Sequence, residues 1–550
     1  MPTCKNCQQQ FTIYPEDKIF YNKINVPEPT FCPDCRCQSR LAWRNERILY
    51  PRQCDSCQKN IISFYSPDKP YLQYCPDCWW GDKWAAPVLD YDPSVPFLKQ
   101  YNELLLKTPH LAMISTHGLN SDYCAHSADY KDCYRCISGI KGEELYYCYW
   151  VINSSESADC ALSFELQKCY ECVHCRNLFN GIFCFDCEGC SDIAFCLDCF
   201  SCHNCLGCVG LRHKQYQIFN QPVSPQKFAQ ALAEAKTDPF KFYQEFYQFS
   251  LKFPRIFARL RHCEKSTGEY LYNCTDSHHC FEGEELEECA YLWNIPQGAS
   301  AMHDAAYAAT NEMSFNNVSI IRSKYLVSTC TCWDCAFLTY CFQCFYSNNL
   351  FGCAGQKHGG YKILNKKYSE GEYKKLVSKI KMELISQDKY GQFFPIEFSP
   401  FTYNESIAQE YYPLSRDEVI KNNWQWQDNL PSTIGKETAK NIPRDISQID
   451  DSFVNEILAC TVCGRNYKII VQELKFYKDM GLPIPQECFD CRHLRRLKQR
   501  NPHKLWQRQC MCQNTNHGHK GRCTSQFATT YAPNRPELVY CEDCYNKEIY

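Results

Sequence analysis

The sequence predicts a mainly β protein: two narrow β-solenoids with twelve residues per turn, formed by tandem duplication, with helical caps and linkers and Cys4 zinc ribbons at both ends. Three observations support this prediction. Cysteines recur every twelve residues through the middle of the chain, this middle segment is present twice, and similar Cys-x-x-Cys pairs occur near both ends. A fixed short period is typical of a repeat architecture.

The composition is that of a cysteine-rich protein that binds metal. The chain has 550 residues, 44 cysteines and a net charge of −3. Its first residues lack the apolar segment of an export signal, and no apolar run is long enough to span a membrane. Because Cys-x-x-Cys pairs without an export signal favour bound metal over disulfides, we expect a cytoplasmic zinc protein with no membrane contact.

Changes in composition divide the chain into five predicted domains. The terminal segments contain the Cys-x-x-Cys pairs, and the middle contains the repeat. A stretch without a clear period, rich in Pro, Asn and Asp, follows the second repeat segment. The predicted domains are 1–95 (twin zinc-ribbon module), 96–225 (helix plus first β-solenoid and cap), 226–385 (helices plus second β-solenoid, cap and helix), 386–457 (connector) and 458–550 (twin zinc-ribbon module).

The first module contains four Cys-x-x-Cys pairs within about eighty residues. Each pair presents two thiolates from a tight turn, and two such pairs complete a closed tetrahedral zinc site. The simplest pairing is sequential. It predicts two sites, the first made by Cys4, Cys7, Cys32 and Cys35, and the second by Cys54, Cys57, Cys75 and Cys78.

The last module repeats the first at a constant offset of 456 residues, so that its third site is Cys460, Cys463, Cys488 and Cys491. The fourth site is altered. Cys541 and Cys544 match Cys75 and Cys78, but the preceding pair has become Cys510-Met-Cys512, followed by His517, His519 and Cys523. We favour Cys510 and Cys512 as the ligands, with Cys523 as the substitute. The chain is therefore expected to hold about four structural zinc ions.

Segments of about forty residues at both ends resemble a known family. The segment that ends in Cys32-Pro-Asp-Cys35-Arg36, and its partner that ends in Cys488-Phe-Asp-Cys491-Arg492, resemble the "probable zinc-ribbon" family of small bacterial proteins. The whole arrangement is similar to an uncharacterised family of cysteine-repeat, zinc-ribbon-flanked proteins of small-genome bacteria. This resemblance implies the architecture and supplies no activity.

A basic stripe follows the first site of each module. If the chain continues as a helix, Arg36, Arg40, Arg44 and Arg47 share one face, and the copy offers Arg492, Arg495, Arg496 and Arg500. From position 460 to 512 there are eleven Lys or Arg against four Asp or Glu. Basic patches of this kind bind phosphate backbones, which predicts a nucleic-acid interface. The alternative is a solvated helix face, or arginines that pair with the protein's own acidic parts.

The repeat itself predicts the solenoid. Period-3.6 patterns cannot hold a twelve-residue interval with a three-residue sub-period, whereas a coil of twelve residues with every third side chain inward can. Eight further cysteines share this register, and no charged residue occupies an inward position, as a dry interior requires. The interval is kept by Cys124, Cys136, Cys148, Cys160, Cys172, Cys184, Cys196 and Cys208.

A second copy follows at an offset of 145 residues and slips by one residue between Ala301 and Met302. Both copies are acidic. Positions 122–209 contain thirteen acids against five bases, and positions 268–353 contain ten against two. Such surfaces repel nucleic acid and attract basic surfaces, including the chain's own ribbons. The inward cysteines fit free thiols that behave as small hydrophobic groups. Disulfides across a coil, such as Cys184 with Cys190, and thiolates that bind soft metals are the alternatives.

The motifs favour a non-enzymatic role. The sequence has no phosphate-binding Gly-x-x-x-x-Gly-Lys loop and no His-Glu-x-x-His motif, and its zinc sites are expected to be closed. The main hypothesis is a zinc-binding scaffold that docks a nucleic-acid-containing partner, RNA or a ribosome-like particle, through its ribbon helices. The alternatives are a platform that assembles other proteins on the acidic solenoids, and a thiolate store for metal or redox equivalents.

Overall fold

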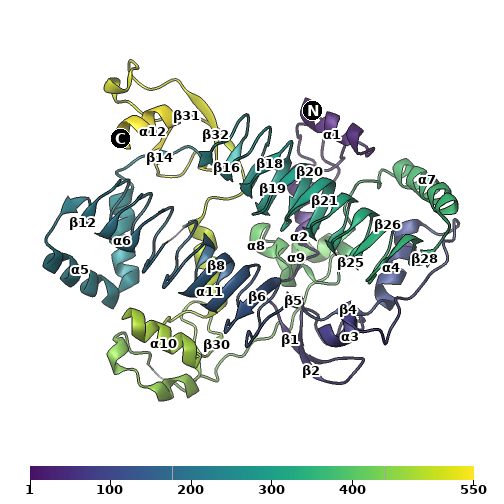
Figure 1. The fold of residues 1–550 in the computed structure, drawn as a ribbon, viewed down its shortest axis with the longest axis horizontal. Coiled ribbons are helices and arrows are strands. Elements are labelled where there is room, and N and C mark those ends of the chain that lie inside the picture. Colours follow the sequence, from purple (N-terminus) through teal and green to yellow (C-terminus); the bar gives the residue numbers. More distant parts are fainter. Residues whose placement is uncertain (176–177, 440, 550) are drawn as a thin grey trace.

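The computed structural model describes residues 1–175, 178–439 and 441–549. The fold is mixed, with 24% of residues in helices and 30% in strands, so the mainly β class predicted for it is too narrow. Two stacks of parallel strands fill the middle of the molecule (Figure 1). Cysteine clusters lie in both terminal segments. Within the described ranges, no helix combines the length and apolarity that a bilayer crossing needs.

The first ladder (residues 115–222) keeps the predicted interval. Neighbouring strands are parallel and pair residues twelve positions apart, such as Ala128 with Ile140. Isolated bridges with the same interval connect β9 to β10. The strands are β5 (Ser115–Thr116), β6 (Ser127–Lys131), β7 (Ile140–Tyr146), β8 (Tyr149–Ala158), β9 (Ala161–Phe164), β10 (Ser191–Ala194), β11 (His203–Leu206), β12 (Gln215–Ile218) and the antiparallel β13 (Gln221–Pro222).

The second ladder (residues 260–367) repeats this arrangement. Its one-residue slip is present, because Leu292 pairs with Ala305, thirteen positions on. The extra residue precedes Ala299, which lies in the ladder interior, so the slip does not fall between Ala301 and Met302 as the sequence suggested. The strands are β15 (Leu260–Arg261), β16 (Gly268–Tyr272), β17 (Cys280–Glu284), β18 (Leu286–Glu287), β19 (Ala290–Ile295), β20 (Ala299–Ala306), β21 (Asn311–Ile321), β22 (Lys324–Val327), β23 (Cys330–Trp333), β24 (Ala336–Thr339), β25 (Phe342–Phe345), β26 (Ser347–Phe351), β27 (Gly359–Ile363) and the antiparallel β28 (Lys366–Lys367).

The predicted inward cysteines are buried inside the ladders. Cys160 and Cys172 are both 0% exposed. The Cys160 thiol donates to the backbone carbonyl of Ala158 at 3.4 Å, and the Ser157 hydroxyl donates to that of Ser155 at 2.8 Å. An inward cysteine or serine therefore satisfies the carbonyl two residues earlier. No disulfide joins cysteines of the described chain, and none of its ladder cysteines belongs to a potential metal group.

A left-handed backbone conformation explains the three-residue sub-period. The residue before an inward position commonly has positive φ, as at Asp129 (55°), Asp159 (55°) and Asn204 (52°). Each such residue turns the chain, so that a coil is divided into triplets. The conformation costs about 1–2 kcal/mol for an ordinary residue. Backbone bonds between coils offset it, for example the N–H of Asp159 to the carbonyl of Tyr146 at 2.9 Å.

Helices cover the ends of the ladders (Figure 1). Helices α5 (Pro225–Thr237) and α6 (Pro239–Ser250) follow the first ladder, and α7 (Glu370–Ser386) follows the second. Helix α4 (Phe97–Lys107) precedes the first ladder but packs on the second, where its Phe97 ring lies 5.1 Å from that of Phe351. The connector contains the short helices α8 (Ala408–Tyr411) and α9 (Arg416–Lys421), and the turns η1 (Ile396–Phe398), η2 (Tyr403–Glu405), η3 (Ile446–Gln448) and η4 (Asp451–Asn455).

The terminal modules contain short elements related by the sequence repeat. The first consists of α1 (Pro15–Lys23), α2 (Pro33–Leu41), β1 (Tyr50–Gln53), β2 (Asn60–Ser63), β3 (Gln73–Tyr74) and α3 (Pro76–Trp80). The second consists of β29 (Leu458–Ala459), β30 (Asn466–Tyr467), α10 (Val471–Met480), α11 (Phe489–Gln499), β31 (Trp506–Gln509), η5 (Thr515–His517), β32 (Gln526–Thr529), β33 (Val539–Tyr540) and α12 (Glu542–Ile549). Strand β3 pairs with β4 (His110–Leu111), and β33 pairs with β14 (Arg255–Ile256).

The two ladders lie side by side. The hydroxyl groups of Tyr149 and Tyr307 are 2.7 Å apart, and the ring of His174 stacks on that of Tyr270 at 3.6 Å. Tyr270 also donates a hydrogen bond to Asp186 at 2.6 Å. These contacts join coils of one ladder to coils of the other, so the central body is continuous.

We expect Cys172→Asp to lower the free energy of unfolding by at least about 3 kcal/mol, because it places an unpaired carboxylate in the interior. The control is Leu119→Asp, which adds the same group where the side chain is 56% exposed. Its effect should stay near about 0.5 kcal/mol. Urea unfolding followed by circular dichroism measures both, and equal losses would contradict the inward position of Cys172.

Candidate metal centres and the buried arginine clusters

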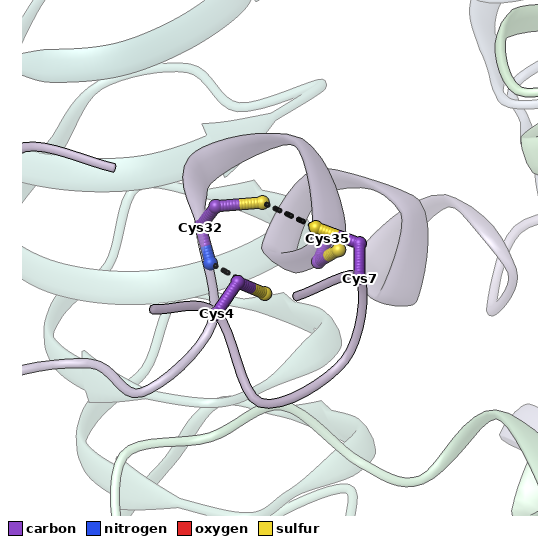
Figure 2. Close-up of side chains that lie close together, drawn as sticks. All are labelled: Cys4, Cys7, Cys32 and Cys35. Carbon is purple, nitrogen blue, oxygen red and sulfur yellow. Dashed lines mark hydrogen bonds between the residues drawn. The ribbon is translucent and has the colours of Figure 1, made fainter. Parts of the chain in front are cut away.

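The first predicted metal site is assembled as expected. The sulfur atoms of Cys4, Cys7, Cys32 and Cys35 all lie within 4.8 Å of one another. Figure 2 shows the four side chains converging, with 3.7 Å between the sulfurs of Cys7 and Cys32. The backbone N–H of Cys32 donates to the sulfur of Cys4 at 3.2 Å. Four thiolates in this arrangement are the donor set of a closed, structural zinc site.

The same N–H to sulfur bond recurs in other tetrads. Cys75 donates to the sulfur of Cys54 at 3.3 Å, and Cys541 donates to that of Cys510 at 3.3 Å. Burial opposes ionisation of Cys54, but backbone N–H groups that face its sulfur outweigh burial and lower its pKa to about 7. The pKa of Cys460 is lowered to about 7 for the same reason. The thiolate form that binds metal is therefore favoured at Cys54 and Cys460, whereas burial raises the pKa of Cys510 to about 11.

Each second knuckle also begins a helix. Cys32, Cys75 and Cys488 are the N-cap residues of α2, α3 and α11. Proline follows the first two, and its fixed φ suits the first helical position. A metal ion held by these cysteines would therefore fix the start of the helix, and the partial positive charge of the helix terminus stabilises the thiolates.

The second and third tetrads also match the prediction, and the fourth requires a correction. Cys510 is grouped with Cys523, Cys541 and Cys544, and Cys512 is not part of this tetrad. Cys523 stands three residues before β32, just as Cys57 stands three residues before β2. The choice of Cys512 as a ligand of this tetrad was wrong, because it was based on the short spacing from Cys510 and did not consider the position of Cys523 relative to β32. Cys512 lies beside His517 instead, with 3.2 Å between its sulfur and Nδ1.

The arginines of the first module point into the second ladder. Helix α2 ends at Leu41, so Arg44 and Arg47 lie beyond it, contrary to the predicted four-arginine helix face. Arg36 and Arg40 pair with Asp304 at 2.9 and 3.2 Å. Past the helix, the Arg44 guanidinium pairs with Glu46 at 2.7 Å, and that of Arg47 lies 3.3 Å from Asp490.

The arginines of the last module point into the first ladder. Arg492 and Arg496 each lie 2.7 Å from an oxygen of Asp159. Arg492 also pairs with Glu473 at 3.2 Å. Arg495 donates to Glu171 at 2.8 Å, and Arg500 pairs with Glu282 of the second ladder at 2.6 Å.

This burial corrects the expectation that both modules present an exposed arginine face. Arg36, Arg40, Arg44, Arg492 and Arg496 are buried, while Arg47, Arg495 and Arg500 are partly buried and paired. Burial opposes the charge of Arg36, but the carboxylate of Asp304 outweighs it and raises the pKa. Asp159 does the same for Arg492. The guanidinium groups of Arg36 and Arg492 are therefore charged and pair with carboxylates of the same chain. This agrees with the alternative in which the arginines pair with the protein's own acidic parts.

The two arginine clusters are related by the internal repeats. Arg40 and Arg496 are 456 positions apart, the offset of the modules, and Asp159 and Asp304 are 145 apart, the offset of the ladders. The first module thus docks on the second ladder, and the last module docks on the first. The strand pairs β3 with β4 and β33 with β14 are also equivalent: β14 follows β4 by 145 positions, and β33 follows β3 by 466, ten more than the module offset. Each module therefore contacts both halves of the central body.

Neither family models nor curated proteins identify a relative of this chain: no family model matches it, and the curated proteins contain no significant match to it. The interpretation of the site therefore depends on its geometry alone.

Metal content tests the tetrads. Cys35→Ser and Cys491→Ser each remove one of four ligands, so each variant should retain one zinc ion fewer per chain than the unmodified protein. Elemental analysis of dialysed protein measures this. The matched control is Cys263→Ser, because Cys263 is a partly buried thiol outside every potential metal group of the described residues. Equal zinc in Cys35→Ser and the unmodified protein would contradict the first site.

A buried histidine predicts a pH dependence. His303 stacks on Phe20 of α1 at 3.8 Å, faces Asp17 at 3.6 Å, and also lies beside Tyr291, Asp304 and Arg36. Burial lowers its pKa from 6.5 to about 3. The unfolded chain binds this proton more readily, so its contribution to stability is full above pH 6.5 and is lost as the pH falls towards 3.

We expect His303→Phe to flatten the fall in unfolding free energy between pH 6.5 and 4 by up to about 1.4 kcal/mol per pH unit. Urea unfolding at several pH values, with zinc present, measures the slope. Thiolate protonation affects both proteins equally, so identical slopes would show that His303 does not contribute.

Proposed function

We propose that this protein is a non-enzymatic zinc-binding scaffold, in which terminal zinc modules hold two twelve-residue β-solenoids side by side. The observation that carries the proposal is the paired burial of arginines: Arg36 and Arg40 meet Asp304, and Arg492 and Arg496 meet Asp159. Each cluster directly follows a cysteine tetrad along the chain. Metal binding and docking of the module are therefore coupled through one short helix.

The coupling has a physical basis. A buried ion pair gives little net stability, because the loss of hydration offsets the attraction. The pairs instead demand accurate placement, since a displaced guanidinium leaves Asp159 or Asp304 buried and unpaired. Cys35 and Arg36 are adjacent on α2, as Cys491 and Arg492 are on α11. A metal ion at the first turn fixes the helix and so keeps the arginines in register with the carboxylate.

Removal of zinc tests this coupling. We expect chelation to raise amide exchange in α1, α2, α10 and α11, while the ladder interiors stay protected, because the described ladder cysteines form no metal group. Hydrogen–deuterium exchange with and without a chelator measures both regions in one experiment. Unchanged protection in the four module helices would contradict the proposal, and so would simultaneous loss of protection throughout the ladders.

Removing one aspartate should release one module. Asp159→Asn leaves Arg492 and Arg496 buried without their shared carboxylate, and we expect a loss of about 3–5 kcal/mol together with faster exchange in α11. The control is Asp334→Asn, which breaks the more exposed ion pair with Arg322 and should cost at most about 1 kcal/mol. Similar losses in the two variants would mean that the buried pairs do not anchor the module.

Docking of RNA or a ribosome-like particle stays a prediction. Since the arginines proposed for it pair within the chain, a phosphate backbone would have to contact exposed bases instead, such as Lys475, Lys498 and Lys504. The second candidate, a platform for a basic protein, is favoured by a groove of about 1340 Å³ along the second ladder. Five acids against two bases line this groove: Glu284, Glu285, Glu287, Glu312 and Asp334, with Arg322 and Lys324.

A crosslinking pull-down with and without nuclease separates the two partner classes. If the acidic groove binds a basic protein, capture survives nuclease and is lost in the double variant Glu285→Lys, Glu312→Lys. If nucleic acid is bound, capture is lost with nuclease and weakened by Lys475→Glu with Lys498→Glu. Nuclease-resistant capture that the groove variant leaves intact would exclude both surfaces.

A further inference from the structure

The last module contains an insertion that the first module lacks. Cys510 matches Cys54 at an offset of 456, whereas Cys523 matches Cys57 at 466, so ten residues are added between them. The flanking strands keep the same pairing in both modules, since Trp506 faces Thr529 just as Tyr50 faces Ser63. The added residues therefore leave the hairpin intact and form a separate loop.

This insertion loop supplies three metal-ligating side chains: Cys512, His517 and His519. Their donor atoms and the sulfur of Cys544 all lie within 4.8 Å of one another. The Cys512 sulfur is 3.2 Å from Nδ1 of His517, and the Cys544 sulfur is 3.4 Å from Nε2 of His519. Cys512, His517 and Cys544 are buried and His519 is partly buried. Two thiolates with two imidazoles form a common tetrahedral zinc donor set.

Both histidines are held by a partner on their other nitrogen. Nδ1 of His519 lies 2.9 Å from the carbonyl oxygen of Gly521, so this N–H donates to it and Nε2 is free to face Cys544. Nε2 of His517 lies 3.0 Å from the side-chain amide of Asn514 and 3.4 Å from a carboxylate oxygen of Glu548, so that Nδ1 faces Cys512. Metal-bound histidines are characteristically oriented in this way by a carbonyl or a carboxylate. These contacts are independent of the clustering of the four donors.

Cys544 also belongs to the tetrad with Cys510, Cys523 and Cys541. We propose that the last module holds a centre of two zinc ions, in which the Cys544 thiolate bridges the Cys4 ion and a second ion bound by Cys512, His517 and His519. Five thiolates and two neutral imidazoles around two Zn²⁺ carry a formal charge of −1, against −2 for a single Cys4 ion. The second ion thus reduces the negative charge of the tetrad.

The position of Cys544 gives the second ion a structural role. Cys544 lies on α12, the helix whose Tyr545 hydroxyl hydrogen-bonds Asp198 of the first ladder. The matching helix α3 instead buries Trp79, whose ring lies 5.4 Å from that of Phe345. On α12 the smaller Tyr545 stands in the position of Trp79. A second ion would add a link between α12 and the insertion loop.

Metal counting and cadmium NMR test the proposal on the full chain, expressed without a histidine tag. After saturation with Zn²⁺ and removal of excess ion, we expect five ions per chain, one for each of the five donor groups. Substitution with ¹¹³Cd should give one pair of resonances with mutual scalar coupling through the shared sulfur, one of them at the position typical of mixed sulfur and nitrogen ligands. Four ions per chain would overturn the proposal, and five ions without the coupled pair would overturn the bridge.

Variants assign the second ion to the loop. His519→Ala and Cys512→Ser should each bind four ions and lose the ¹¹³Cd coupling while the remaining Cys4 resonances persist. His117→Ala, an exposed ladder histidine, and Cys263→Ser are the controls and should keep five. Because the coupling is measured on the unsubstituted chain, a variant that fails to fold does not decide the outcome. Five ions in a folded His519→Ala variant, with the coupling unchanged, would overturn the assignment.

Discussion

The narrow interior of the ladders is the constraint on which the rest of the structure depends. Each coil encloses so little space that its inward side chains are uncharged and mostly compact, with Tyr130 as the largest exception. The cysteine and serine side chains among them satisfy carbonyl groups of their own coil. Every charged side chain of the coils that the structure describes is therefore displaced to the outside. The ladders become acidic surfaces, and Asp159 and Asp304 are available to the arginines of the modules.

This charge distribution explains why the molecule is one body rather than a string of domains. The modules are basic where they meet the ladders, and their guanidinium groups can be buried only opposite carboxylates. The internal repeats make the arrangement nearly symmetric, since equivalent arginines meet equivalent aspartates at both ends. The two halves of the chain thus resemble two subunits that exchange their terminal modules, with contacts repeated in the manner of a two-fold dimer interface.

Much of this was predictable from the sequence. The interval of the cysteines predicted the pairing of Ala128 with Ile140, and the spacing of the Cys-x-x-Cys pairs predicted three complete tetrads. The left-handed residues were not predictable, because Asp129 and Asp159 are ordinary residues whose conformation is imposed by the coil. The strand register that selects Cys523 could have been found by aligning Gln526 with Asn60 across the insertion.

The role of the arginines could not be predicted, because i, i+4 spacing is the same on an exposed and on a buried helix face. Asp159 and Asp304 are two of many acids in the ladders, and their burial is seen only in the fold. Their separation by the ladder offset was a usable signal, since the arginines repeat at the module offset. A pair of acids that repeats alongside a pair of basic clusters indicates a contact more strongly than either pattern alone.

The crossed docking has a consequence for the order in which a ribosome produces the chain. The first module leaves the exit tunnel long before Asp304 is synthesised, and the first ladder waits for Arg492 and Arg496, which come near the end. The first half therefore cannot complete its contacts as it emerges, so folding is not finished segment by segment. A prematurely terminated chain would lack Arg492 and Arg496, so the carboxylate of Asp159 would stay without these partners and the first ladder would stay uncovered there.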